Sequence, residues 1–163
     1  MNTPKLSYRK LQGTFAKFRI AIIQSQFNHN ITDKLLEGAE ACLRAHTIPQ
    51  KNVEIFICPG AFELPQVANR LAASKRWDAI ICLGAVIRGE TPHFEYVSAE
   101  TARGIQDVAL KYSVPVVMGV LTTDNERQAL DRVGGVQGHK GWDAALTAME
   151  MASLFQSLKK KHR

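Results

Sequence analysis

The sequence predicts an α/β protein in which one four-stranded parallel sheet lies between two layers of helices. Short apolar runs at 18–23, 53–58, 79–84 and 115–121 are each followed by a segment whose apolar residues recur every three or four positions. Strands buried on both faces appear as continuous apolar runs, and parallel neighbours need a crossover. The chain, 1–163, is long enough for one such domain and too short for two. Right-handed crossovers then give a three-layer, doubly wound, flavodoxin-like arrangement.

Five helices are expected, because each of the first three strands precedes one amphipathic stretch and the fourth precedes two. The last two are expected at roughly 124–134 and 140–158. The residues that set the helical spacing are Ile31, Leu35, Ala39 and Cys42, then Leu64, Val67, Ala68 and Leu71, then Val97, Ile105, Val108 and Tyr112, and finally Ala145, Met149, Ala152 and Phe155.

The expected helix ends carry residues that commonly cap helices. Thr32, followed by Asp33, suits the start of the first helix. In "TDNE" the Thr123 hydroxyl is placed to accept a hydrogen bond from the Glu126 amide, and the Glu126 carboxylate to reach back, as in a capping box. The glycine pair 134–135 suits the end of that helix.

Composition and charge are those of an ordinary globular protein. Hydrophobic residues make up 45% and charged residues 22%, and no apolar run approaches the ~20 residues of a membrane span. The net charge of +6 arises at the ends, because 1–19 holds five cations and no acid and 159–163 holds four cations, whereas 20–158 has 12 cations and 15 acids. Solvated tails, 1–11 and 159–163, around a core of about 12–158 are therefore favoured, and a nucleic-acid partner is not expected.

The cysteines and the N-terminus favour a cytoplasmic protein. Cys42, Cys58 and Cys82 form no CxxC pair and are interpreted as buried thiols in a reducing compartment. No second ligand pair accompanies "HFE" (93–95), so a zinc site is not expected. The N-terminus has no apolar h-region. It is basic like a transit peptide but holds a single Ser, so an organellar address is the minor alternative.

Candidate functional residues lie in the loops that follow the predicted strands. Ligands of doubly wound sheets bind beyond the carboxyl ends of the strands, which here are the loops 24–31, 59–63, 84–94 and 121–124. The first loop contains Phe27 and Asn28, the second Gly60 and Glu63, and the third Arg88, Glu90, Thr91 and His93.

The third of these loops has the strongest chemical character. Its backbone amides at 89–91 precede a helix, which favours an anion, and His93 beside them suits proton transfer near neutral pH. Each candidate also has a structural alternative: Phe27 packed on the first helix, Glu63 stabilising a first helical turn, His93 as a satisfied helix-start residue, and Lys140 as a solvated cation. Their joint location at strand ends favours a site.

Five motifs in a fixed order resemble the lumazine synthase family over about residues 12–158. They are "FN" (27–28), "PGAFELP" (59–65), "GAVIRGETPHF" (84–94), "GVLTT" (119–123) and "GHKGWDAA" (138–145). The resemblance implies the condensation of 5-amino-6-(D-ribitylamino)uracil with 3,4-dihydroxy-2-butanone 4-phosphate. The implied products are 6,7-dimethyl-8-ribityllumazine, phosphate and water, formed without a cofactor or metal in the penultimate step of riboflavin biosynthesis.

The resemblance also implies a role for each matching residue. Phe27 would stack on the pyrimidine, and His93 would be the proton shuttle. The remaining expected substrate-binding residues are Ala61, Phe62 and Glu63 for the ribityl chain, backbone groups of Ala85, Val86 and Ile87 for the uracil edge, Glu90, Thr91 and Arg132 for the phosphate, and in addition Met118 and Lys140. Arg88 receives no role.

Two positions depart from the family pattern. The residue before "GVLT" is usually a Phe that the neighbouring subunit donates to the ring pocket, and here it is Met118. A thioether is also able to cover a ring face. The usual "GNKG" is "GHKG" here, so His139 replaces an amide side chain beside Lys140.

The resemblance implies a homopentamer that uses small-molecule substrates and is functionally linked to riboflavin synthase. In some members twelve pentamers form a sixty-subunit icosahedral shell. Members that stay pentameric often have extra residues between the last two helices, and none stand between Arg132 and "GHKG", which permits the shell. Two alternatives are a non-catalytic flavin- or lumazine-binding protein, which would lose His93 or Arg132, and a flavodoxin-like electron carrier, which would need a phosphate loop after the first strand.

Overall fold

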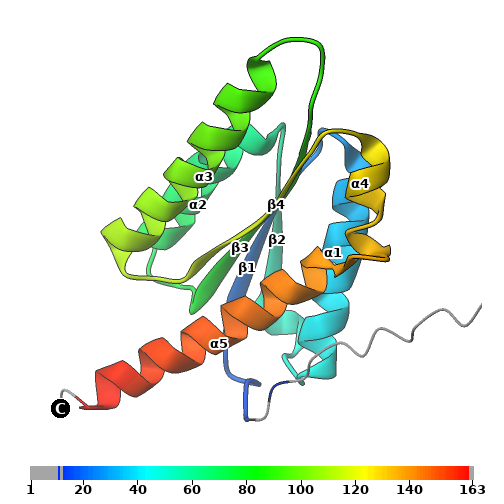
Figure 1. Cartoon of the computed structure of the whole chain (residues 1–163). Coiled ribbons are helices and arrows are strands. Elements are labelled where there is room, and N and C mark those ends of the chain that lie inside the picture. Colours follow the sequence, from blue (N-terminus) through cyan, green and yellow to red (C-terminus); the bar gives the residue numbers. More distant parts are fainter. Residues whose placement is uncertain (1–10, 12, 162–163) are drawn as a thin grey trace, which may run out of the picture.

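The computed structural model describes residue 11 and residues 13–161, and its main sheet has four parallel strands in the order β2-β1-β3-β4 (Figure 1). The strands are β1 (Ile20–Ser25), β2 (Val53–Cys58), β3 (Ala79–Ile87) and β4 (Val116–Thr123). The chain starts in the middle of the sheet, moves to one edge at β2, and crosses back to β3 and β4. This topology confirms the predicted doubly wound, flavodoxin-like fold.

Helices cover both faces of the sheet, as Figure 1 shows. One face carries α1 (His29–Ala45) and α5 (Lys140–Lys161), and the other carries α2 (Leu64–Ala73) and α3 (His93–Tyr112). The smaller elements are the 3-10 turns η1 (Gln50–Asn52) and η2 (Ala61–Glu63), the short helix α4 (Glu126–Leu130), and the hairpin of β5 (Val133–Gly135) and β6 (Gly138–His139).

Alternate residues of the central strands pack into two separate hydrophobic cores, one on each face of the sheet. In β1, Ile20 and Ile22 pack with α1 and α5, whereas Ala21 and Ile23 pack with α2 and α3. Each fully buried Ile contributes about 1.5–3 kcal/mol relative to an exposed one. The two cores explain why these strands appear in the sequence as unbroken apolar runs.

Strand β3 is three residues longer than its apolar run. Residues 85–87 pair with Leu121–Thr123 of β4, so they belong to the strand and not to the loop expected at 84–94. On the other side of β3 the pairing with β1 ends at Leu83. Residues 85–87 therefore extend beyond β1 and have a strand neighbour on one side.

The predicted start of the first helix is wrong. Helix α1 begins at His29, and its N-cap is Asn28 in the left-handed region, with φ 59°. Asn tolerates that conformation better than most residues. Thr32 lies inside the helix, where its hydroxyl donates to the Ser25 carbonyl, 2.8 Å away, so it fastens the helix to the end of β1.

The capping box predicted at "TDNE" is also wrong, because β4 continues to Thr123. The N-cap of α4 is Asn125, whose side chain accepts from the Gln128 amide at 3.0 Å. The Gln128 side chain accepts in turn from the Asp124 amide at 2.9 Å, so the returning hydrogen bond goes to the residue before the N-cap and not to the N-cap itself. Helix α4 ends at Leu130, and the glycine pair 134–135 lies in β5 instead of ending a long helix.

The chain ends differ from the predicted tails where they are described. The Leu11 amide donates to His46 Nε2 at 3.0 Å, which places residue 11 against the folded body. Helix α5 continues to Lys161, so the predicted tail 159–163 begins inside a helix. Residues 1–10 and 162–163 lie outside the described residues. Within the described part, no helix combines the length and the apolar character needed to cross a membrane.

Candidate active site

A cavity of about 650 Å³ lies beyond the carboxyl ends of β1, β2 and β3, where this topology favours ligands. We call it the strand-end cavity. Its lining residues are Phe27, Asn28, Pro59, Gly60, Ala61, Phe62, Glu63, Ala85, Val86, Ile87, Gly89, Thr91, His93, Phe94, Tyr96 and Val97. The residues expected from the first three strand-end loops thus meet in one place, with the exception of Arg88 and Glu90.

Phe27 is presented to the cavity by the backbone of the first loop. The Gln26 and Phe27 amides donate to the carbonyls of Cys58 and Pro59, at 2.9 and 3.0 Å, so the β1–β2 ladder continues into the loop. The Phe27 side chain is 72% exposed. It is therefore not packed against the first helix, and its ring face is open to a ligand.

Asn28 locks the first loop to β3. Its Nδ2 donates to the Ala85 carbonyl at 2.9 Å, and its left-handed backbone turns the chain into α1. In the sequence Asn28 is distinguished only as the neighbour of Phe27, and no role is predicted for it. The preference of Asn for positive φ is the signal that could have identified the turn.

The second loop presents an aromatic ring and a carboxylate through a short turn. The Glu63 amide donates to the Gly60 carbonyl at 3.2 Å and closes η2, which leads directly into α2. Glu63 occupies the N-cap position of α2, yet its side chain makes no capping hydrogen bond, so the carboxylate faces the cavity. Phe62 is 50% exposed beside it.

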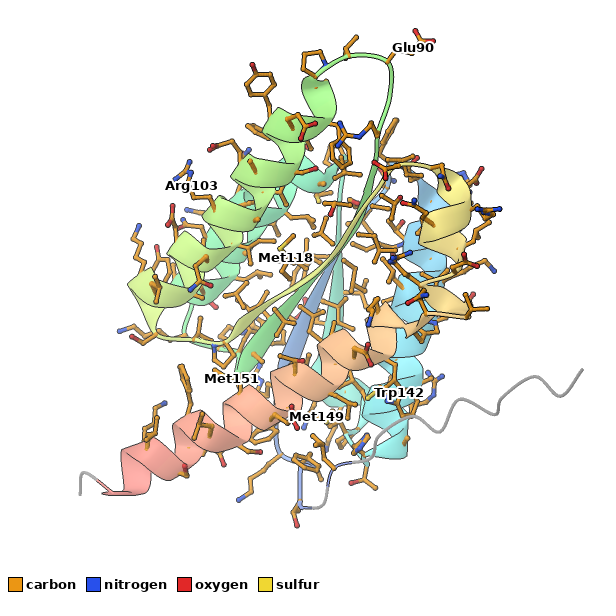
Figure 2. All side chains as sticks on the ribbon, in the orientation of Figure 1. Glu90, Arg103, Met118, Trp142, Met149 and Met151 are labelled. Carbon is orange, nitrogen blue, oxygen red and sulfur yellow. The ribbon has the colours of Figure 1, made fainter. Side chains whose placement is uncertain are left out.

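The third loop brings His93 to the rim of the cavity. His93 is the first residue of α3, and its amide lies 3.5 Å from the Thr91 hydroxyl oxygen. Tyr96 and Val97, three and four positions later on the same helix face, also line the cavity and were not expected from the sequence. Glu90 stands exposed at the tip of the loop, away from the cavity lining (Figure 2).

Three expected site residues lie elsewhere in the single chain. Met118 and Lys140 line a second cavity, of about 600 Å³, between α3, β4 and α5, which we call the edge groove. Arg132 lines neither cavity; its guanidinium donates to the Gln128 carbonyl at 2.8 Å. The Lys140 amide donates to the Arg132 carbonyl at 2.8 Å, so the β5–β6 hairpin places these two cationic residues side by side.

The cysteines are buried and unpaired with one another, as predicted. Burial, with a smaller contribution from Glu63, raises the pKa of Cys58 to about 11, and burial followed by Asp143 raises that of Cys42 to about 12. Burial also raises the pKa of Cys82. These thiols are protonated near pH 7 and are poor nucleophiles. Among the described residues, no three His, Cys, Asp or Glu side chains gather in a way that could hold a metal ion.

Comparison with known proteins identifies the family. Residues 17–156 match the family model described as 6,7-dimethyl-8-ribityllumazine synthase. A protein of that name from Sulfurospirillum multivorans is 49% identical over 141 residues, which cover 86% of this chain and 90% of that protein. The matched residues include all the loops of the strand-end cavity. The chain therefore belongs to the 6,7-dimethyl-8-ribityllumazine synthase family.

Proposed function

We propose that the strand-end cavity is where this chain condenses 5-amino-6-(D-ribitylamino)uracil with 3,4-dihydroxy-2-butanone 4-phosphate. The family makes the chain a transferase of riboflavin biosynthesis that forms 6,7-dimethyl-8-ribityllumazine. The location is supported by one observation above all. Three separate loops converge on one cavity and bring together an exposed aromatic ring, a carboxylate and an imidazole.

The pyrimidine ring is proposed to lie between Phe27 and the end of β3. The exposed Phe27 ring offers a stacking face worth ~0.5–1.5 kcal/mol beyond the area it buries. Residues 85–87 extend past β1, so their backbone has no strand neighbour on the cavity side. Backbone donors and acceptors fixed in a strand suit the edge of a uracil, because their positions cost little to order.

The ribityl chain is proposed to run along η2, with its hydroxyls donating to the Glu63 carboxylate. Ala61 and Phe62 provide the wall of this part of the cavity. A hydrogen bond from a hydroxyl to an ionised carboxylate is stronger than a neutral one, at about 1.5–3 kcal/mol. Glu63 is therefore proposed to select a substrate that carries a polyol chain.

The phosphate and the proton transfers are assigned to the third loop. The amides at 89–91, Glu90 among them, and the Thr91 hydroxyl are proposed to hold the phosphate, with Arg132 supplying a cation. His93 is proposed to move protons while the amine and ketone form an imine with loss of one water, phosphate is eliminated, and the second amine condenses with the remaining carbonyl to close the ring with loss of a second water. Positioning two substrates beside one imidazole supplies much of the remaining rate.

The site is proposed to be completed by a second copy of the chain. Met118 pairs with Cys82 in the sheet, whereas the strand-end cavity begins at Ala85, roughly 10 Å further along the strand at 3.3 Å per residue. Met118 is 43% exposed in the edge groove and does not line the cavity of its own chain. If Met118 and Arg132 serve a ligand on Phe27, they do so from a neighbouring subunit.

A homopentamer is the assembly we propose, and such pentamers are able to form the sixty-subunit shell. The edge strand β4 and the apolar edge groove are surfaces that a neighbouring copy would bury. The unpaired buried thiols support a cytoplasmic location. Riboflavin synthase, which consumes the lumazine product, is the proposed functional partner.

Two measurements test the proposal together. Purified chain is mixed with both substrates, lumazine formation is followed by absorbance, and sedimentation velocity is run on the same samples. We expect lumazine to form in the fractions that sediment as pentamers or larger. Full activity in a species that sediments as a monomer would contradict the shared site.

A further inference from the structure

Arg88, the first residue after β3, contacts two other segments of the chain. Its amide donates to the Thr123 carbonyl at the end of β4, 2.8 Å away. Its Nε donates to Asp124 Oδ1 at 3.0 Å, and its Nη1 pairs with Glu95 Oε1. The centre of the guanidinium lies 4.3 Å from the centre of the Phe94 ring. One side chain thus joins the third loop to the start of α3 and to the β4–α4 turn.

The loop that Arg88 anchors is otherwise open. A methyl group at Gly89 would meet no atom within 4 Å, and Glu90 is exposed at the tip. Arg88 ties the loop to β4 where the loop leaves the sheet, and its contact with Phe94 lies one residue after His93, the first residue of α3.

The charge of Arg88 is already matched by carboxylates. Its hydrogen bonds to Glu95 and Asp124 raise the pKa of the guanidinium. Both side-chain hydrogen bonds of Arg88 go to carboxylates of the protein, so Arg88 is a poor candidate for the cation that binds the phosphate. Its planar fork and its stacking on Phe94 are instead features that set geometry, and a Lys would reproduce neither.

We propose that Arg88 is a positioning residue for the reaction, holding the third loop and His93 in the arrangement that the phosphorylated substrate requires. The proposal rests on the proposed function of that loop. Because the ion pairs are exposed, they contribute little to stability. Their effect is on placement, and a displacement of ~1 Å in a catalytic group costs up to about 10²-fold in rate.

Arg88→Gln is the first test. We expect kcat to fall about 10-fold to 10²-fold and KM for the butanone phosphate to rise. KM for the pyrimidine and the Kd of the lumazine product should change by less than about twofold, because Phe27, Glu63 and the end of β3 are untouched. A general loosening of the fold would instead lower kcat, raise KM for both substrates and raise the Kd of the product together.

Arg103→Gln is the matched control. Arg103 lies further along α3 and also holds two exposed ion pairs, with Glu100 and Asp107 (Figure 2). It lines neither cavity. This variant should keep wild-type kinetics, which would show that loss of two ion pairs on α3 is not itself the cause.

Asp124→Asn and Arg88→Lys complete the test, and they keep it informative if Arg88→Gln folds poorly. Asp124→Asn should lower kcat less than Arg88→Gln does, and it should likewise raise KM for the butanone phosphate but not for the pyrimidine. Adding Asp124→Asn to Arg88→Gln should cause no further loss of kcat. Arg88→Lys should recover only part of kcat. The proposal would be overturned by an equal rise in KM for both substrates, by additive losses of kcat in the double variant, or by wild-type kinetics in Arg88→Gln. His93→Ala, assayed alongside, tests the proposed function separately.

Discussion

His93 is exposed at the first position of α3, at the rim of the strand-end cavity. We expect His93→Ala to lower kcat by roughly 10²-fold, the lower end of what a general acid–base group contributes, because imine chemistry proceeds without it once the substrates are positioned. The measurement is the steady-state rate of lumazine formation between pH 6 and 8. His29→Ala, an exposed histidine at the start of α1, is the control. Full kcat in His93→Ala would remove His93 from the mechanism.

The residues that could be predicted from the sequence are those in the loops that follow an apolar run. Phe27, Glu63 and His93 were expected because polar or aromatic side chains at strand ends converge in a parallel sheet. Asn28 and Arg88 could not be assigned, because their roles depend on partners far along the chain, Ala85 for one and Asp124 for the other. Contacts of that kind leave no local pattern in the sequence.

The β5–β6 hairpin contains the His139 that replaces the family's usual Asn. Its ring packs over α1 so closely that a Cβ on Gly38 would lie 1.9 Å from the ring carbon Cε1. Burial lowers the pKa of His139, against smaller opposing effects of Asp143 and Glu37. The Trp142 amide also points at His139 Nδ1, 3.4 Å away, which favours an unprotonated nitrogen there.

His139 should therefore make stability depend on pH. Because the folded-state pKa is below the ordinary value of about 6.5, the unfolded chain binds more protons as the pH falls through that range. As far as His139 is concerned, the free energy of unfolding is therefore highest above about pH 7 and falls as the pH drops through and below the ordinary histidine range. We expect His139→Asn to show a shallower loss than the wild type over that interval in urea titrations. Identical slopes for the two proteins would contradict this expectation.

Helix α5 crosses α1 at a glycine. A Cβ on Gly141 would lie 2.0 Å from the Leu35 carbonyl oxygen, which is backbone and cannot rotate away. Ala is ordinarily the better helix residue by up to about 1 kcal/mol, but here the clash should dominate and cost about 1–3 kcal/mol. Thermal unfolding of Gly141→Ala should show a lower Tm. Gly89→Ala, where the added methyl has open space, should change stability by less than about 0.5 kcal/mol.

Element boundaries were harder to predict than the elements themselves. The apolar runs located all four strands because each of the central ones is buried on both faces. They missed the last three residues of β3, which lack a strand neighbour on the β1 side and of which Val86 and Ile87 are only half-buried. The hairpin 133–139 was missed because three of its seven residues are glycines, which carry no periodic signal.

At the scale of the whole molecule, the strand-end cavity and the edge groove lie in different parts of one chain. Residues expected to act on one ligand are divided between them, with Phe27 in the cavity and Met118 in the groove. Figure 2 shows Met118 on β4, in the region between α3 and α5. A division of this kind is explained if each ligand is held by two subunits, which makes activity depend on assembly.

Met118 allows this shared site to be tested by a single substitution. Met loses more rotamer freedom than Phe when it is ordered, and it lacks the aromatic face that would stack with the ligand ring. We therefore expect Met118→Phe to tighten binding of the lumazine product by up to ~0.5–1.5 kcal/mol, with no change in KM for the butanone phosphate. Titration calorimetry of product binding to the intact oligomer measures this.

The competing expectation for Met118→Phe comes from packing. If the neighbouring pocket is shaped around a thioether, Phe overfills it and weakens product binding by about 1–3 kcal/mol. Either change in affinity places residue 118 against the ligand, because in its own chain it lies outside the strand-end cavity. Met151→Leu is the control, since Met151 lines the same edge groove from α5. Unchanged product affinity in Met118→Phe, with the oligomer intact by sedimentation, would show that residue 118 does not contact the ligand.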